Sequence, residues 1–298
     1  MTGLGALIKR NCKLFFKDKG MFFTSLITPG ILLVLYSTFL ANVYRDSFRS
    51  AIPEFLSIPD KLINATVAGE LMSSLLAVCC VTVAFCSNFL MVTDKVSGAR
   101  RDLTMTSVKK STMALGYYIA TVISTLIVCF AATGLCFLYL LKEGWYLSFA
   151  DVLGIFSDVI LLVLFGTALS SIINLFLSSQ GQISAVGTIV SAGYGFICGA
   201  YMPISSFSNG LQKVISFLPG TYGTSLIRNH SLNGVLSEMP SNGFPSEVIE
   251  GIKDSIDCNI YFFDNRVSMG AMYAVLVLSV VFLIGIYILL NVLRKKKN

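Results

Sequence analysis

Few side chains in this sequence could carry out chemistry. Its 298 residues include one histidine, His230, and eight cysteines, of which only Cys258 lies away from the apolar stretches. The sequence contains no Gly-x-x-x-x-Gly-Lys-Ser/Thr loop, so it does not bind ATP in that way. His-Glu-x-x-His, Gly-x-Ser-x-Gly and paired aspartates within apolar segments do not occur either. The sequence therefore predicts neither a catalytic centre nor a metal site.

Two carboxylates, Glu70 and Asp158, lie in or beside apolar segments. An acidic residue inside a membrane segment is a candidate proton relay or substrate contact. The uncharged run restarts at Val159, however, so we expect Asp158 at the outer interface, near a helix start. Neither an internal duplication nor a buried charge pair is apparent, which disfavours an ion-coupled carrier.

The segment 94–110 gathers charges of both signs between two apolar stretches. A protein without a soluble domain can meet a soluble partner only at such a loop or at its termini. The alternative is a solvated loop that only fixes the topology.

The apolar stretches are the elements that must position these residues. Hydrophobic residues make up 55% of the chain and charged residues 13%, a composition that lipid must solvate. A bilayer core about 30 Å thick requires about 20 apolar residues of helix. The stretches that satisfy this criterion predict six transmembrane helices, at 21–44, 67–93, 112–141, 159–177, 183–202 and 267–293.

Charge gives the orientation of these helices. Most of the 22 basic residues, including those at 294–297, lie on one side of the alternation, with only Asp18, Asp94 and Asp102 of the 16 acidic residues. Both termini are therefore expected in the cytoplasm, with the chain in the cytoplasmic membrane. The basic residues lie at membrane exits without interleaved aromatic residues, which excludes nucleic-acid binding.

Residues 1–20 are expected to form an amphipathic helix at the membrane surface. Leu4, Leu7, Ile8, Cys12 and Phe15 share one helical face, whereas Lys9, Lys13, Lys17 and Arg10 occupy the other. A short basic segment that only fixes the topology is the alternative.

Small and polar residues predict close helix contacts. Gly187, Ser191, Gly195 and Gly199 recur every four residues and predict a tight contact with another span or with a second copy of the chain. Gly166, Ser170 and Asn174 form a more polar stripe on the fourth span, and Asn88 adds an amide to the second.

The region 203–266 is expected to be an external loop. Proline and glycine interrupt it, yet 211–218 and 222–227 are apolar and predict short helices that dip back into the outer leaflet. Residues 236–264 are acidic and predict an external cap.

Taken in order, these segments resemble the membrane subunit of type-2 ABC exporters over essentially the whole chain. The resemblance rests on the basic start at 8–19 with Pro29 in the following span, and on the pairing of 199–204 with 217–222. Within 94–110 the residues that carry it are Asp94, Gly98, Arg101, Leu103 and 106–108.

The resemblance implies an all-α polytopic fold in a single domain, 1–298. It has an N-terminal surface helix, a cytoplasmic coupling helix and a re-entrant helical pair before the last span. Two permease subunits, identical or homologous, would rest on separate ATPase subunits that bind ATP and Mg, with no cofactor in this chain. The implied cargo is an amphiphile, such as a drug, an antimicrobial peptide or a lipid-like molecule.

The resemblance also assigns roles to residues of this chain. The residues expected to couple to the ATPase are Asp94, Lys95, Gly98, Arg100, Arg101 and Leu103. Lys9, Lys13 and Lys17 would lie along the membrane beside the ATPase. Ser107 departs from the family pattern, in which many relatives have proline after the coupling segment. The residues expected to line the substrate pathway are Tyr36, Asn88, Ser191 and Tyr194.

Two other functions fit the sequence. A membrane sensor or scaffold would bind a ligand outside and signal through 94–110. An ion-coupled carrier would need Asp158 or Glu70 to titrate during transport.

Overall fold

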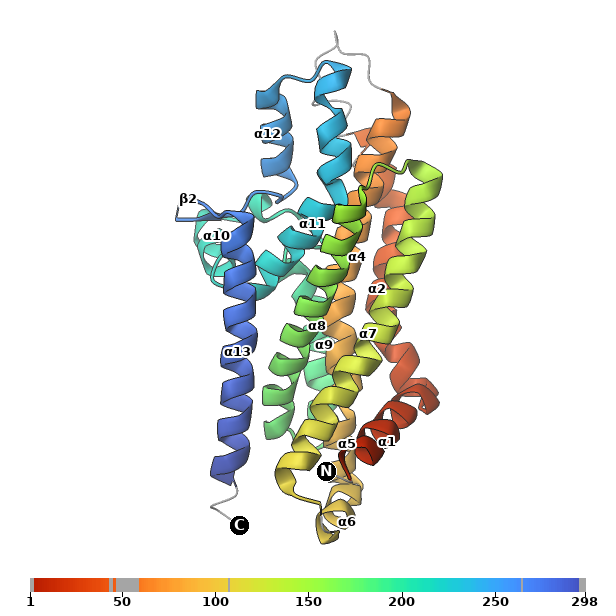
Figure 1. Cartoon of the computed structure of the whole chain (residues 1–298), viewed down its shortest axis with the longest axis vertical. Helices are drawn as coiled ribbons and strands as arrows, with labels where there is room; N and C mark the ends of the chain where they lie inside the picture. Colours follow the sequence, from red (N-terminus) through yellow and green to blue (C-terminus); the bar gives the residue numbers. More distant parts are fainter. Residues whose placement is uncertain (1–2, 43–44, 47–58, 107, 264, 295–298) are drawn as a thin grey trace.

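The computed structural model describes residues 3–42, 45–46, 59–106, 108–263 and 265–294, and these residues form an elongated bundle of helices (Figure 1). The helices that build the bundle are α1 (Leu4–Lys17), α2 (Lys19–Leu35), α4 (Asp60–Asn88), α5 (Leu90–Val96), α6 (Ala99–Met105), α7 (Lys110–Glu143), α8 (Phe149–Phe176), α9 (Gln180–Ile197) and α13 (Met269–Arg294). A π-helical turn, η1 (Tyr36–Leu40), continues α2.

The region before α13 holds shorter elements. They are the 3-10 turns η2 (Ile204–Ser206) and η3 (Pro240–Asn242), the helices α10 (Asn209–Ile215), α11 (Pro219–Glu238) and α12 (Ser246–Ser255), and the strands β1 (Tyr261–Phe262) and β2 (Asn265–Arg266). The two strands form an antiparallel hairpin, in which Tyr261 pairs with Arg266.

The central element is α4, which contacts α2, α7, α8, α9 and α11 and is buried along almost its whole length. Such a helix carries no hydrophilic face, so its polar side chains must be satisfied within the protein. The hydroxyls of Thr66, Ser73 and Thr82 donate to carbonyls three or four residues earlier in the same helix. Small hydroxyl residues are therefore compatible with this buried position.

Helix α1 meets α2 at a bend of 70° and lies across α7. Asp18 produces the break, because its carboxylate accepts a hydrogen bond from the Met21 amide as the N-cap of α2. Leu7 and Phe15 point inward and are buried, and Gly116 of α7 leaves room for Leu7. The predicted amphipathic helix is therefore present and packs on the bundle.

Helix α8 begins ten residues earlier than predicted. Ser148 and Asp151 form a capping box at its N-terminus, where Ser148 accepts from the Asp151 amide and Asp151 accepts from the Ser148 amide. The expectation that Asp158 begins a helix at the outer interface was wrong, because Asp158 lies inside α8 and is completely buried. Hydropathy alone missed this start because the first turns of α8 carry Asp151 and Asp158.

Four helices of the described chain are long and apolar enough to cross a membrane: 60–96, α7, α8 and 269–291. The bent pair of α1 and α2 raises the number to five if it is one span. The prediction of an all-α polytopic membrane protein is confirmed, whereas six spans remain a prediction.

The predicted fifth span corresponds to α9. Three features named in the sequence lie outside the described residues: the predicted end of the first span at Tyr44, Ser107, and the basic residues 295–297.

The α12 region covers the end of the bundle farthest from α6 (Figure 1). Leu232 and Met239 of the α11 segment, Ile249 of α12 and Cys258 pack against Leu62 at the start of α4. Helix α11 continues to Glu238, so the apolar piece predicted at 222–227 belongs to a helix of 20 residues. The start of α1 and the end of α13 both lie at the opposite end, the end that carries α6 (Figure 1).

Candidate functional site

The charged segment at 94–110 is held rigidly at its first residue. Asp94 is buried at the end of α5, where Arg10 of α1 forms an ion pair with both of its carboxylate oxygens, at 2.7 and 3.0 Å. The hydroxyl of Tyr117, on α7, donates to the same carboxylate at 2.5 Å. Bidentate arginine–carboxylate pairs fix orientation as well as distance. Asp94 therefore joins α1, α5 and α7 at one point.

Lys95 attaches the same segment to α8. Its ammonium donates to the carbonyls of Asn174, Leu175 and Leu177, at 2.8 to 3.0 Å. The last carbonyls of a helix have no partner within the helix and carry partial negative charge. Lys95 therefore caps the C-terminus of α8.

Helix α6 follows a sharp turn and projects from the end of the bundle (Figure 1). Gly98 makes this turn with a φ of +84°, a conformation that side chains rarely adopt. Arg101 and Met105 are exposed, while Arg100 and Leu103 are half-buried. The segment thus consists of a fixed base, Asp94 and Lys95, and an exposed helix.

The lysines of α1 form the exposed face that was predicted. Lys9, Lys13 and Lys17 are all exposed, at the same end of the molecule as α6. Arg10 does not belong to this face as predicted, because it turns inward to Asp94.

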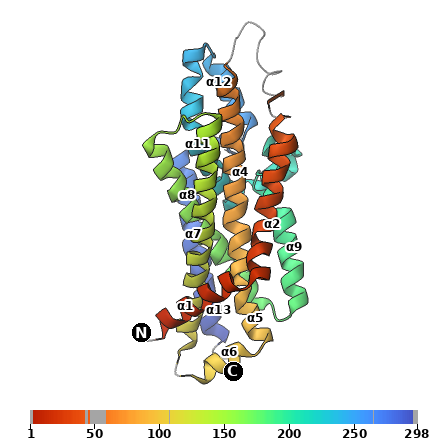
Figure 2. The same ribbon diagram turned by 90° about the vertical axis from the view of Figure 1, so that its right-hand side faces the viewer.

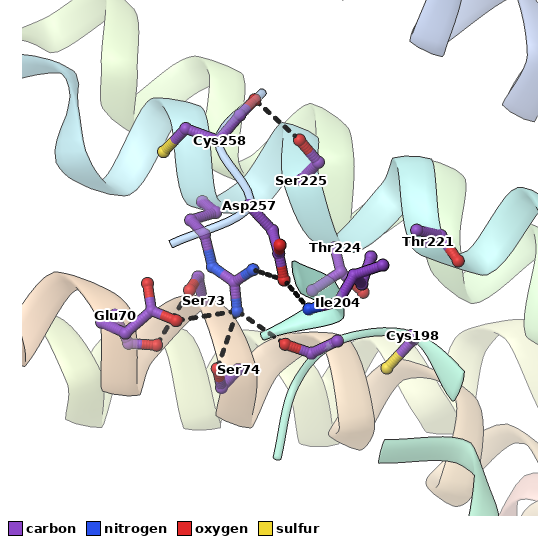
Figure 3. A network of polar contacts seen from close by, with 12 residues as sticks. Glu70, Ser73, Ser74, Cys198, Ile204, Thr221, Thr224, Ser225, Asp257 and Cys258 are labelled. Carbon is purple, nitrogen blue, oxygen red and sulfur yellow. Dashed lines mark hydrogen bonds and ion pairs between the residues drawn. The ribbon is translucent and has the colours of Figure 1, made fainter. Parts of the chain in front are cut away.

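Arg228 of α11 is the centre of a second buried polar network. Figure 3 labels its partners Glu70, Ser74 and Asp257. Its guanidinium contacts Glu70 of α4 at 2.8 Å and Asp257, after α12, at 3.4 Å. It also donates to the Gly199 carbonyl at 2.9 Å and the Ser74 hydroxyl at 3.3 Å. Arg228 is 1% exposed, Asp257 4% and Glu70 5%, so water does not screen these charges.

Asp257 ties the network to the turn that follows α9. Its carboxylate accepts a hydrogen bond from the Ile204 amide at 2.8 Å (Figure 3). Burial raises the pKa of Asp257 to about 6, although the charge of Arg228 opposes that rise. The expectation of no buried charge pair was therefore wrong.

A match to a family model decides the class of protein. The model described as the ABC-2 type transporter membrane family matches residues 2–230. The chain belongs to this family. It is therefore the permease of an ABC-2 transporter, and the family implies association with an ABC ATPase partner. A search of curated proteins found no match.

The four residues expected to line the substrate pathway of the permease have different environments. Asn88 is 1% exposed and donates to Ser170 and Ser171 of α8, at 2.9 Å each, so it joins α4 to α8. Tyr36 is buried as well, and Tyr194 packs against Gly220 of α11. Only Ser191 of this set is partly accessible.

The stripe of small residues on α9 serves several contacts. Gly187 faces Phe89, and Gly195 lies under the ring of Tyr201, which folds back onto α9 and donates to the Ser191 carbonyl at 3.2 Å. Gly199 lies beyond the end of the helix with a φ of +75°. The stripe therefore does not form one continuous face for packing against another helix. Tyr201, which follows α9, covers Gly195, and Gly199 lies outside the helix.

The stripe on α8 behaves as predicted. A Cβ atom at Gly166 would lie 3.1 Å from the Val81 Cα and 3.2 Å from the Cys80 carbonyl, so α4 and α8 approach at backbone distance.

Asp158 joins three helices. Its carboxylate accepts from the Tyr273 hydroxyl of α13 at 2.5 Å, and its other oxygen lies 2.6 Å from His230 Nδ1 of α11. Burial lowers the pKa of His230, but the hydrogen bond and charge of Asp158 outweigh that effect and raise it above its ordinary value.

Sequence reasoning missed Arg228 because it lies outside the apolar stretches and far along the chain from its partners. One signal was available. Thr221, Thr224, Ser225 and Arg228 recur at helical spacing after Pro219, the residue that begins α11.

Proposed function

We propose that the permease is the membrane subunit of an ATP-driven exporter. It moves an amphiphilic molecule, such as a drug, an antimicrobial peptide or a lipid-like compound, out across the cytoplasmic membrane. Separate ATPase subunits, which bind ATP and Mg, supply the energy. Both termini and α6 lie on the cytoplasmic side.

The observation that carries this proposal is the construction of the coupling segment. An exposed helix can transmit force from a soluble partner only if the residues that attach it to the bundle are held in place. Asp94 and Lys95 attach that base to α1, α7 and α8 through charge-assisted hydrogen bonds. A push on α6 would move these helices together, as rigid elements do in allosteric transitions.

A second permease subunit, identical or homologous, forms the other side of the proposed substrate pathway. Helices α2 and α9 both flank α4 on one side of the bundle (Figure 2). Their outward side chains are apolar, with Phe23 and Ile27 of α2 and Ile189 of α9 between 55% and 70% exposed. An apolar, weakly polar wall suits an amphiphile better than a highly charged solute.

The proposal is tested by co-expressing the permease with candidate ABC ATPases and measuring co-purification and ATP hydrolysis. The double variant Arg100→Glu/Arg101→Glu should lose the ATPase or its coupled activity. The matched control Lys61→Glu/Lys142→Glu reverses two exposed charges at the opposite end and should retain both. If no ATPase co-purifies with the intact wild type, the proposal fails.

An ion-coupled carrier is the second candidate, and Asp158 favours it. Asp158 is buried in α8 against His230, and its hydrogen bond and charge raise the pKa of that imidazole above its ordinary value. This alternative predicts uptake or efflux driven by a proton gradient in proteoliposomes without ATP.

A further inference from the structure

The end of the molecule opposite the termini contains a polar pocket that neither the coupling segment nor the proposed pathway uses. Its volume is about 370 Å³, and α10, α11, the end of α12 and the residues before the β-hairpin enclose it. Among its lining residues are Asn209, Gln212, Lys213, Asp254, Tyr261 and Phe263.

The pocket presents one cationic and one anionic side chain that are not paired with each other. Asp254 is positioned by two donors, the Asn259 amide at 2.7 Å and the Tyr261 hydroxyl at 3.0 Å, which both reach the same carboxylate oxygen. The ammonium of Lys213 lies 5.8 Å from the centre of the Phe263 ring, and no ion pair to it is found among the described residues. Asp257 also lines the pocket, but Arg228 and the Ile204 amide already contact its carboxylate.

Exposed aromatic side chains lie beside this pocket. Phe217 contacts Phe262 and Phe263 edge to face, with ring centres 5.1 and 5.8 Å apart. The three rings are between 36% and 61% exposed. Phe262 and Phe263 belong to the hairpin region that precedes α13, and Phe217 packs on them, so the cluster lies near the start of a candidate membrane span (Figure 1). Aromatic rings are enriched at this depth, between headgroups and acyl chains.

We propose that this pocket binds the zwitterionic headgroup of a phospholipid-like amphiphile. Lys213 contacts the phosphate, with the Asn209 amide as a neutral donor. The Gln212 amide is not available for this role, because it already donates to the Ser205 and Phe207 carbonyls. Asp254 contacts the ammonium group, which the rings of Tyr261 and Phe263 also attract. A pocket of about 370 Å³ is of headgroup size and too small for acyl chains, which would lie along Phe217 and Phe262.

Binding here does not require ATP or a transport direction, so the proposal is independent of the proposed function. It is tested by titrating the purified full-length permease in a neutral detergent with three probes and measuring heat. The probes are dihexanoylphosphatidylethanolamine, dihexanoylphosphatidylglycerol and the chain-free glycerophosphoethanolamine. We expect the first to bind about tenfold tighter than either of the others, because each lacks one of the required contacts.

Two variants remove one charge each while preserving shape. Lys213→Met and Asp254→Asn should each weaken binding of the zwitterionic lipid about tenfold. The matched controls Lys142→Met and Glu247→Gln change exposed charges at the same end of the molecule and should leave the affinity unchanged. An unchanged melting temperature for each variant shows that folding is preserved.

Three results would overturn the proposal. Equal binding of the anionic lipid would indicate a simple anion site, and equal binding of the chain-free compound would exclude recognition of the amphiphile. Unaltered binding by both pocket variants would place the lipid elsewhere.

Discussion

Arg10 and Asp94, separated by 84 positions in the chain, form a bidentate ion pair that attaches the N-terminal helix to the base of the coupling segment. The Asp94 side chain is 6% exposed and the Arg10 side chain is 31% exposed, so the pair lies at the boundary between the interior and the surface. The pair therefore connects two elements that sequence analysis assigned to separate tasks, the membrane surface and ATPase coupling. Movement of α6 should be transmitted to α1 through this contact.

Replacing Asp94 with asparagine should weaken this attachment. The change leaves Arg10 without its charged partner and should lower the free energy of unfolding by about 1–3 kcal/mol. It should also reduce ATP hydrolysis by the permease–ATPase complex. Thermal unfolding and ATPase assays check both effects, with Lys142→Ala, an exposed change at the end of α7 far from the coupling segment, as the control. Wild-type coupling in Asp94→Asn would contradict a positioning role for the ion pair.

Removing Arg228 should have a larger effect on stability. Arg228→Met leaves Glu70 and Asp257 buried without a cation, which typically costs about 3–5 kcal/mol. Arg266 also pairs with a carboxylate, Glu250, but both side chains are exposed, so Arg266→Met should cost less than about 1 kcal/mol. Chemical unfolding of the two variants in the same detergent measures the difference. Equal losses would mean that the buried network contributes no more than a surface pair.

The pair of His230 and Asp158 should make stability depend on pH. The folded pKa of His230 is raised above its ordinary value of 6.5, so its contribution is complete below that pH and is lost as the pH rises through the folded pKa. The ionisable groups that surround the imidazole are Asp158 and Asp151 of α8 and Tyr273 of α13.

The measurement is the melting temperature of wild type minus that of His230→Gln, from about pH 5.5 to pH 8.5. The difference should be largest at the acidic end and shrink above neutrality. A difference that does not change with pH would show that the imidazole keeps one charge state throughout.

The close approach of α4 and α8 can be tested with two glycines. Gly166→Ala places a methyl group against the backbone of α4 and should destabilise the permease by about 1–3 kcal/mol. Gly134→Ala, in the middle of α7, meets nothing within 4 Å and should be neutral or stabilise by up to about 1 kcal/mol. Unfolding midpoints of both variants provide the comparison. A neutral Gly166→Ala would show that the helices can separate at no cost.

Periodicity and hydropathy predicted the helices that bury apolar faces. The lysine face of α1, the close packing at Gly166 and the extent of α7 followed from residue spacing, because each depends on the pattern within one helix. The partner of Gly166, α4, did not follow from the sequence. The positions of Asp158 and Arg228 did not either. A charge is excluded from the interior only when it lacks partners, and the partners of Arg228 lie on elements distant in sequence.

The contacts of the coupling segment could not be predicted for the same reason. Sequence spacing indicated that Asp94 and Lys95 belong to a charged loop, and a solvated loop was the natural alternative. The structure shows that both side chains are bound to other helices, and that the residues directly after them, from Val96 on, are mostly exposed or half-buried. Contacts between distant segments, such as Arg10 with Asp94, leave no periodic pattern in one sequence.

The most direct test of the coupling role is crosslinking from α6 to the ATPase. A photoreactive residue at Met105, which is 75% exposed on α6, is compared with one at Phe149, which is 78% exposed at the start of α8. In the assembled permease–ATPase complex, Met105 should crosslink to the ATPase and Phe149 should not. An intact complex in which Met105 does not crosslink, or in which both positions crosslink equally, would contradict the assignment of α6 as the coupling helix.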